Sequence, residues 1–122
     1  MMTKLLGVVC FVLVAGSVEA AARCSVPRIS TFDNETVNGQ MTVNSGAQCR
    51  IVLKHSRGPT YSAHIVERPS HGTVTVASGN RIVYRSRSGY VGRDSFTYAR
   101  RGETHAGIPT TRTVRISVNV TE

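Results

Sequence analysis

The side chains that could act in catalysis or bind a metal are few and scattered along the chain. The four histidines are His55, His64, His71 and His105. No two of them are two or four residues apart, which is the spacing that a zinc site on one strand or helix needs. The serines lie in turn-like stretches that lack the glycine elbow of a nucleophile. The sequence therefore predicts a protein that is not an enzyme and has no catalytic residues.

The cysteines suggest a structural bridge. Of the three, Cys10 lies in an apolar N-terminal segment, so Cys24 and Cys49 are the one pair that remains downstream. In an oxidising compartment two such cysteines form a disulfide. Closing a loop of about 25 residues would stabilise the fold by roughly 3–4 kcal/mol. The alternative is two independent buried thiols, and we predict the bridge.

Acidic side chains offer one possible metal site. Asp33, Asn34 and Glu35 are consecutive oxygen-bearing residues, and calcium prefers such ligands. A formal net charge of +8 opposes the binding of a dication. We therefore expect no cofactor and no metal, and do not favour calcium.

The N-terminal segment predicts export. Lys4 precedes an apolar run over residues 5–15, and small residues around Ala20 and Ala22 offer cleavage sites. The run is shorter than the ~20 apolar residues that span a bilayer, although an uncut anchor is the alternative. We expect a cleavable signal peptide over residues 1–22 and a secreted product, periplasmic or extracellular, that does not span the membrane.

The rest of the chain has the pattern of β-strands. Apolar residues recur at every second position, and valine and threonine dominate. No segment has a helical period. We expect one domain over residues 23–122, an all-β antiparallel sandwich or barrel without a parallel sheet. The predicted strands are 36–43, 47–54, 61–67, 73–77, 81–86, 95–100 and 113–120. Four residues around the 78–80 turn are predicted to point inward: Val74, Val76, Ile82 and Tyr84.

Residues 65–120 carry a more specific pattern. A Pro-x-x-Gly-Thr turn leads into a valine strand, and a Gly-Tyr-x-Gly-x-Asp-Ser-Phe-x-Tyr segment follows a tyrosine strand. The residues of this pattern are Pro69, His71, Gly72, Thr73, Tyr84, Gly89, Tyr90, Gly92, Asp94, Ser95, Phe96 and Tyr98. The pattern resembles the bacterial Ig-like, cadherin-like (VCBS-type) repeats of surface adhesins and secreted proteins. The resemblance implies an Ig-like Greek-key antiparallel β-sandwich of about seven strands. This chain holds one copy and is basic, whereas such repeats usually stand in tandem and are acidic.

The motif residues have structural explanations. Gly89 and Gly92 let a loop adopt positive φ, and Gly72 belongs to the preceding turn. Asp94 can accept loop N–H groups. Tyr98 can bury its ring beside Phe96 and donate its hydroxyl to a loop, as a tyrosine corner does.

A basic sheet face is the candidate binding site. The resemblance places strands 47–54 and 81–86 side by side in one sheet. Their outward side chains would form an anion-binding face of Arg50, Lys54, Arg81, Arg85 and Arg87, with Arg57 at its rim. Like charges across a strand pair destabilise one another, which suggests a counterion or partner. The alternative is an arginine-rich composition with solvated side chains.

These observations predict a secreted, non-enzymatic binding or structural module of the cell envelope. As the resemblance implies, its partner would be a protein or an anionic polysaccharide at the cell surface. No specific nucleic-acid binding is expected. One alternative is an assembly or adhesion subunit that pairs through an exposed edge strand. A small secreted enzyme is the other, and only a preformed cleft with converging histidine and carboxylate groups would support it.

Overall fold

The computed structural model describes residues 23–54, 60–78 and 80–122, without the side chain of Tyr61. The predicted signal peptide, His55 and Arg57 lie outside these residues. Every regular element in the described part is a strand, and no helix there is long and apolar enough to cross a membrane. The strands are β1 (Cys24–Ser25), β2 (Thr36–Asn44), β3 (Gln48–Val52), β4 (Thr60–Glu67), β5 (Gly72–Ala77), β6 (Arg81–Ser86), β7 (Gly92–Glu103) and β8 (Pro109–Thr121).

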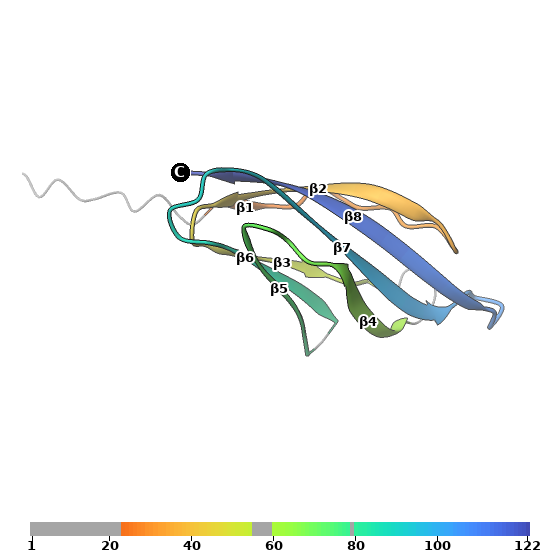
Figure 1. Ribbon diagram of the computed structural model, residues 1–122. Helices are drawn as coiled ribbons and strands as arrows, with labels where there is room; N and C mark the ends of the chain where they lie inside the picture. The colour runs from red at the N-terminus through yellow and green to blue at the C-terminus, as the bar shows by residue number, and fades with distance from the viewer. Residues whose placement is uncertain (1–22, 55–59, 79) are drawn as a thin grey trace, which may run out of the picture.

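The strands form two packed sheets (Figure 1). One sheet has five strands in the order β1-β2-β8-β7-β4, and the other has three in the order β3-β6-β5. This arrangement confirms the predicted Ig-like sandwich. The seven predicted strands are all present, and β1 is an additional one of two residues.

One strand pair departs from the expected antiparallel arrangement. β2 runs parallel to β8, from Thr36 opposite Thr113 to Asn44 opposite Thr121, so the expectation of antiparallel strands is wrong for this pair, although the other pairs of the sheet are antiparallel. Parallel neighbours need a long connection. Here the other strands of the sandwich make that connection, so no crossover helix is needed.

The core lies between the sheets and consists of alternating side chains from both inner faces. Its largest fully buried members are Tyr84, Tyr98, Phe96, Met41, Ile82 and Ile116. Tyr84 and Phe96 stack across the sandwich with their ring centroids 5.5 Å apart. Val76 shares the inward phase of Val74 but is 42 % exposed, since it lies toward the end of edge strand β5.

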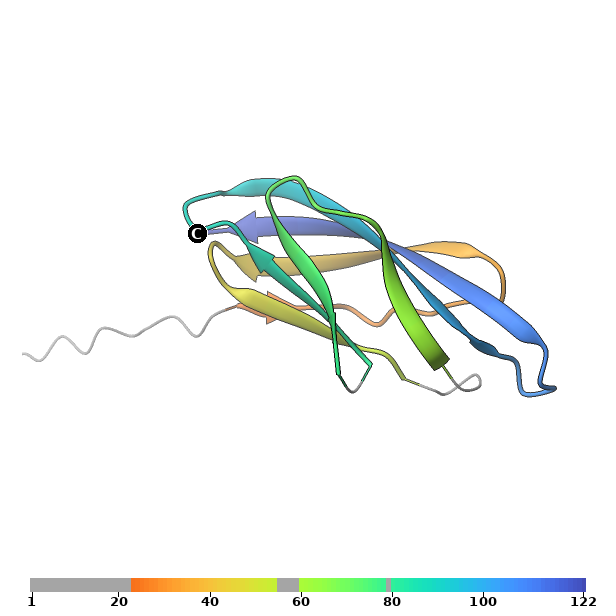
Figure 2. The same ribbon diagram turned by 60° about the horizontal axis from the view of Figure 1, so that its bottom comes forward.

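The disulfide joins the two sheets. Cys24 on β1 is bonded to Cys49 on β3, with 5.4 Å between the Cα atoms. Between β1 and β2, residues 26–35 run along the open side of the sandwich between β2 and β3 (Figure 2). We call residues 26–31 the strap. Ile29 of the strap packs so closely on β2 that a Cβ on Gly39 would lie 3.0 Å from it.

Candidate functional site

Asp94 ties three parts of the sandwich together at one end. Its Oδ1 accepts the backbone N–H groups of Ser70, at 3.0 Å, and Ser95, at 2.9 Å. Its Oδ2 accepts the N–H of His71 at 3.2 Å and the hydroxyl of Tyr84 at 2.7 Å. The buried carboxylate therefore joins the β4–β5 turn to β6 and β7, which is a structural role.

The glycines of the motif sit where a side chain would either collide or be strained by a positive φ. A Cβ on Gly72 would collide with the Arg85 carbonyl and lie 2.9 Å from the Tyr84 hydroxyl. Gly89 and Gly92 have φ values of 86° and 142°, which L side chains rarely adopt. Between them, Tyr90 stacks on His71 with ring centroids 3.9 Å apart. These positions shape the loop and its contact with the β4–β5 turn.

Tyr98 is buried in the core, but its hydroxyl does not make the loop hydrogen bond that we expected. Among the described residues the hydroxyl has no hydrogen-bond partner, and Thr97 Oγ1 is the one fully buried side-chain atom without a partner. The Tyr98 hydroxyl therefore keeps contact with solvent, at the edge of a groove described below. Burial raises the pKa of Tyr98 to about 12, and the charge of Arg100 opposes part of that rise.

We expect the protein to lose stability between pH 10 and about pH 12 because of Tyr98. Its folded pKa is raised to about 12 from an ordinary 10.0. Its stabilising contribution is therefore complete below pH 10 and is lost as pH rises through the folded pKa. A two-unit shift corresponds to at most about 2.7 kcal/mol. Urea unfolding at pH 9 and pH 12 should show a smaller loss for Tyr98→Phe than for the parent. An equal loss would contradict this.

The predicted basic face occupies the outer side of the three-stranded sheet. Arg50 lies on β3 and Arg81 and Arg85 lie on β6, all exposed. Lys54 and Arg87 follow the ends of these strands and are also exposed. Strands β3, β5 and β6 contain no carboxylate. β3 pairs with β6, as predicted.

The cations of this face are staggered. Arg50 lies opposite Val83, Arg81 opposite Val52 and Arg85 opposite Gln48. Arg85 Nη2 donates to Gln48 Oε1 at 3.1 Å. No two cations of the face are directly paired, so the like-charge pairs that we expected across the two strands are not formed. Instead, the charges follow one another along the strands, two residues or about 6.6 Å apart, in the order Lys54, Arg81, Arg50, Arg85 and Arg87. The first four alternate between the β3 and β6 sides, and Arg87 follows Arg85 on the β6 side. The cation track, as we call these five residues, is about 26 Å long.

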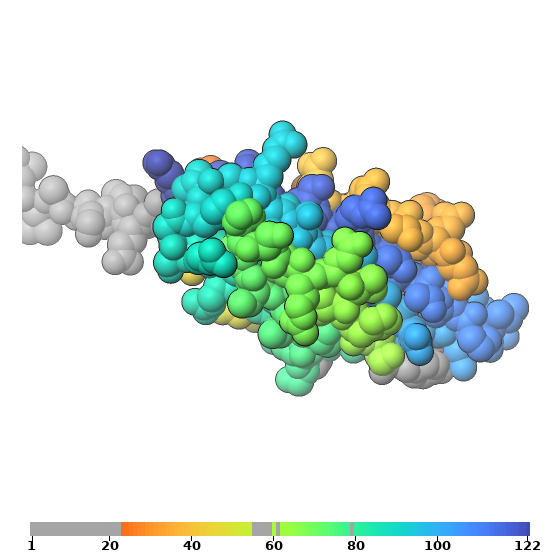
Figure 3. Space-filling view, viewed as in Figure 1, coloured from red at the N-terminus to blue at the C-terminus, as the bar shows by residue number. Residues whose placement is uncertain are grey.

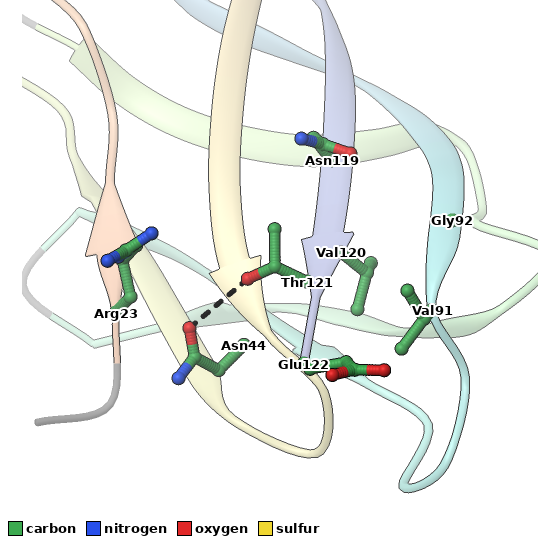
Figure 4. A pocket seen from close by; sticks show the side chains of 8 residues that line it. All are labelled: Arg23, Asn44, Val91, Gly92, Asn119, Val120, Thr121 and Glu122. Atoms are coloured by element: carbon green, nitrogen blue, oxygen red, sulfur yellow. Dashed lines mark hydrogen bonds between the residues drawn. The ribbon is translucent and has the colours of Figure 1, made fainter. Parts of the chain in front are cut away.

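Among the hollows that open on the described surface, three bear on the candidate sites. A shallow one of about 550 Å³ lies at the chain end (Figure 4). Figure 4 shows Arg23 and Glu122 on different sides of it, and Thr121 Oγ1 donates to Asn44 Oδ1 at 3.3 Å. A second, of about 720 Å³, lies on the outer face of the five-stranded sheet beside His71 and Arg93. Neither brings a histidine and several carboxylates together.

The third hollow is a groove of about 700 Å³ between the strap and the edge of β3. Its cations come from the strap, from β3 and the residue Lys54 beyond it, and from the inner face of the five-stranded sheet. It has no carboxylate in its lining, and we call it the strap groove. Its lining cations are Arg28, Arg50, Lys54, Arg100 and Arg112. Arg50 and Lys54 belong to both the cation track and the strap groove.

Two buried arginines form the floor of the strap groove. Arg100 on β7 and Arg112 on β8 lie directly opposite each other on the inner face, and they are 7 % and 3 % exposed. Asp33 neutralises Arg112, with 2.9 Å between its Oδ1 and Arg112 Nη2. Arg100 has no carboxylate partner in the described part of the chain. Burial lowers the pKa of Arg100; Tyr98 opposes part of this shift, and the charge of Arg112 adds to it.

Neutral oxygen atoms hold Arg100 in place. Its Nη2 donates to the Lys54 carbonyl and to Thr60 Oγ1, both at 2.6 Å, and its Nε donates to Thr60 Oγ1 at 3.2 Å. Nη1 has no partner among the described residues, and it is not a fully buried atom. Since Arg100 lines the strap groove, the N–H donors of Nη1 are available there.

The remaining candidates do not converge. His64 is exposed on β4 and His105 is exposed in the turn between β7 and β8. Asp33 is engaged by Arg112, and Asn34 Oδ1 accepts the Thr111 N–H at 3.2 Å. Within residues 23–54, 60–78 and 80–122, no three His, Cys, Asp or Glu side chains form a group that could hold a metal.

The assembly alternative requires an exposed edge strand, and β4 is a candidate for it. β4 is the outer strand of the five-stranded sheet, and it lies uncovered at the front of the space-filling view (Figure 3). Val66 on β4 is 52 % exposed. Register irregularities interrupt β4 between Thr60 and Ser62 and again between Ile65 and Glu67. Such bulges hinder the addition of another strand.

The strap groove could not be recognised from the sequence. Arg100 continues the inward phase of Phe96 and Tyr98, and Arg112 continues that of Val114 and Ile116. That phase was the available signal. It could not show that the β7–β8 register sets the two arginines opposite each other.

Comparison with known proteins agrees with this architecture. A family model described as a bacterial Ig domain matches residues 25–117. No curated protein matches the chain. The matched region begins in β1 and ends in β8, so it covers both sheets.

Proposed function

Because the chain belongs to the bacterial Ig domain family, we propose that it is a non-enzymatic binding module, exported to the cell envelope, that holds an anionic polysaccharide on its cation track. Bacterial Ig domains occur in surface and secreted proteins and serve as structural or binding modules. The cation track supports a binding role here.

One observation carries the choice of ligand. Five cations follow one another along the outer side of a sheet whose strands contain no carboxylate. A linear polyanion lying along the strands would meet a charge about every 6.6 Å. Such a field raises the local concentration of anionic polymers and accelerates their association. The +8 formal charge acts in the same direction.

Replacing Arg81 and Arg85 together by serine should weaken binding to a heparin oligosaccharide by about 30-fold, at roughly 1 kcal/mol for each cation near an anionic surface. The slope of log affinity against log salt should fall by about two, because two fewer counterions are released. Isothermal titration at several salt concentrations measures both quantities.

The matched control is Arg101→Ser with Arg115→Ser. These exposed arginines lie on the other sheet, on β7 and β8, and the double substitution removes the same charge. It should change affinity by less than about threefold, the effect of net charge alone. Equal losses in the two double variants would show that the cation track is not the binding surface.

Pairing through the β4 edge is the competing function, which exposed Val66 favours. It predicts association that grows with protein concentration in the absence of any polysaccharide. Sedimentation of the parent protein separates the two functions, since the polysaccharide model requires no self-association.

A further inference from the structure

We propose that the strap groove receives one acid group of the bound polysaccharide, a carboxylate or a sulfate, and that Arg100 binds it. The inference rests on the proposed function for the identity of the polymer. It makes the strap groove the place where the chemistry of the acid group is recognised, whereas the cation track responds to charge density.

The charges on the floor of the strap groove favour the binding of an anion. Arg100 and Arg112 are both buried and directly opposed across β7 and β8. Like charges at such positions destabilise a sheet, and a buried cation without a counterion costs free energy. Asp33 supplies one negative charge. One more anion would balance the pair, and the lining of the groove contains no carboxylate to supply it.

Hydrogen-bond donors remain available beside the charge of Arg100. Arg100 Nη1 makes no hydrogen bond to the described residues, and neither does the hydroxyl of Tyr98. Both residues line the strap groove. A charged donor together with a hydroxyl suits an oxyanion, since charge-assisted hydrogen bonds are about twice as strong as neutral ones. Hydrogen bonds to Thr60 and to the Lys54 carbonyl already fix the Arg100 guanidinium.

The strap groove is continuous with the cation track. Arg50 and Lys54 stand on the β3 side of the groove and are also members of the track. A polymer lying on the track therefore passes the mouth of the strap groove at the β3 edge. Apolar groups from the strap and β3, including Ile29 and Leu53, would contact the C–H face of a sugar ring.

Small acids test the groove without the polymer. Galacturonic acid and sodium sulfate are titrated into the oxidised, ¹⁵N-labelled protein at constant ionic strength, with sodium chloride as the blank. We expect a saturable shift of the Arg100 Nε–Hε resonance with at least one of the two acids. The tighter of the two identifies carboxylate or sulfate as the preferred group. No shift beyond that caused by chloride would overturn the proposal.

Three variants locate the response. Tyr98→Phe removes a hydroxyl that makes no hydrogen bond to the described residues, so the fold should persist while the small acid binds about tenfold more weakly. Arg100→Gln should abolish the titration, and Tyr98→Phe serves as the test if that variant does not fold. The Arg81→Ser, Arg85→Ser variant should titrate like the parent. Unchanged binding in Tyr98→Phe would remove Tyr98 from the site and contradict the proposed geometry.

The two proposals fail in different ways. If heparin binding does not depend on Arg81 and Arg85 but Arg100 still titrates, the cation track is not the polymer site and the groove remains an anion site. If the polymer binds through the track while Arg100 stays silent, the groove assignment is wrong.

Discussion

Loss of the Cys24–Cys49 disulfide should lower the free energy of unfolding by roughly 3–4 kcal/mol. The bridge closes a loop of 25 residues, and in the chain-entropy model such a closure restricts the unfolded chain by about this amount. For a domain of this size the melting temperature should fall by on the order of 15–25 °C. Thermal unfolding of Cys24→Ser with Cys49→Ser, followed by circular dichroism, measures the effect.

The same variant should affect the strap groove. Cys24 holds β1, which has only two residues, and the strap follows it directly. Without the bridge, the strap is held by contacts such as that of Ile29 with Gly39. The Arg100 resonance should therefore respond less to the small acids at temperatures where the variant is still folded. Reduction with dithiothreitol should weaken the response of the Arg100 resonance in the parent in the same way, and it should not change the response of the variant.

For the stability prediction, a melting temperature lowered by less than about 5 °C in the double cysteine variant would show that the closed loop contributes little.

The strands could be predicted because both sheets bury one face. Alternation fixes which side chains point inward, and β6 extends over the residues that the alternation predicted. β7 and β8 are longer than predicted, since they continue as a hairpin from Arg101 opposite Thr111 to Glu103 opposite Pro109. Backbone hydrogen bonds extend that hairpin through polar residues, where hydrophobic periodicity gives no signal.

Other features depend on contacts between distant parts of the chain. The parallel β2–β8 pair joins residues more than 70 positions apart, and no local pattern encodes such a pairing. The exposed cations Arg50, Arg81 and Arg85 could be placed on one face from their phase in the strands. Arg100 and Arg112 have the phase of core residues, and their burial follows from that phase. Phase alone does not single them out, because arginines are rarely buried.

Replacing Asp94 by asparagine should destabilise the protein by about 3 kcal/mol although the two side chains have the same shape. The Asp94 oxygens accept four donors: the N–H groups of Ser70, His71 and Ser95, and the Tyr84 hydroxyl. An amide turns one of the two acceptors into a donor. In one orientation that donor faces the N–H groups of Ser70 and Ser95, and in the other it faces the His71 N–H, with only the Tyr84 hydroxyl able to turn and accept from it. Hydrogen bonds to a charged acceptor are worth about 1.5–3 kcal/mol each, and a buried donor left unpaired costs about 1–3 kcal/mol. Urea unfolding at pH 7 measures the loss.

The contribution of one of the four donors, the Tyr84 hydroxyl, can be measured separately. Tyr84→Phe alone should cost about 1–2 kcal/mol. In the double variant with Asp94→Asn, the total loss should fall short of the sum of the single losses by at least about 0.5 kcal/mol, since the two groups share a 2.7 Å hydrogen bond. Glu67→Gln is the matched control because Glu67 is an exposed carboxylate at the end of β4, and it should change stability by less than about 0.5 kcal/mol. If Asp94→Asn behaves like this control, the β4–β5 turn is held by packing of Tyr90 on His71 and not by the carboxylate.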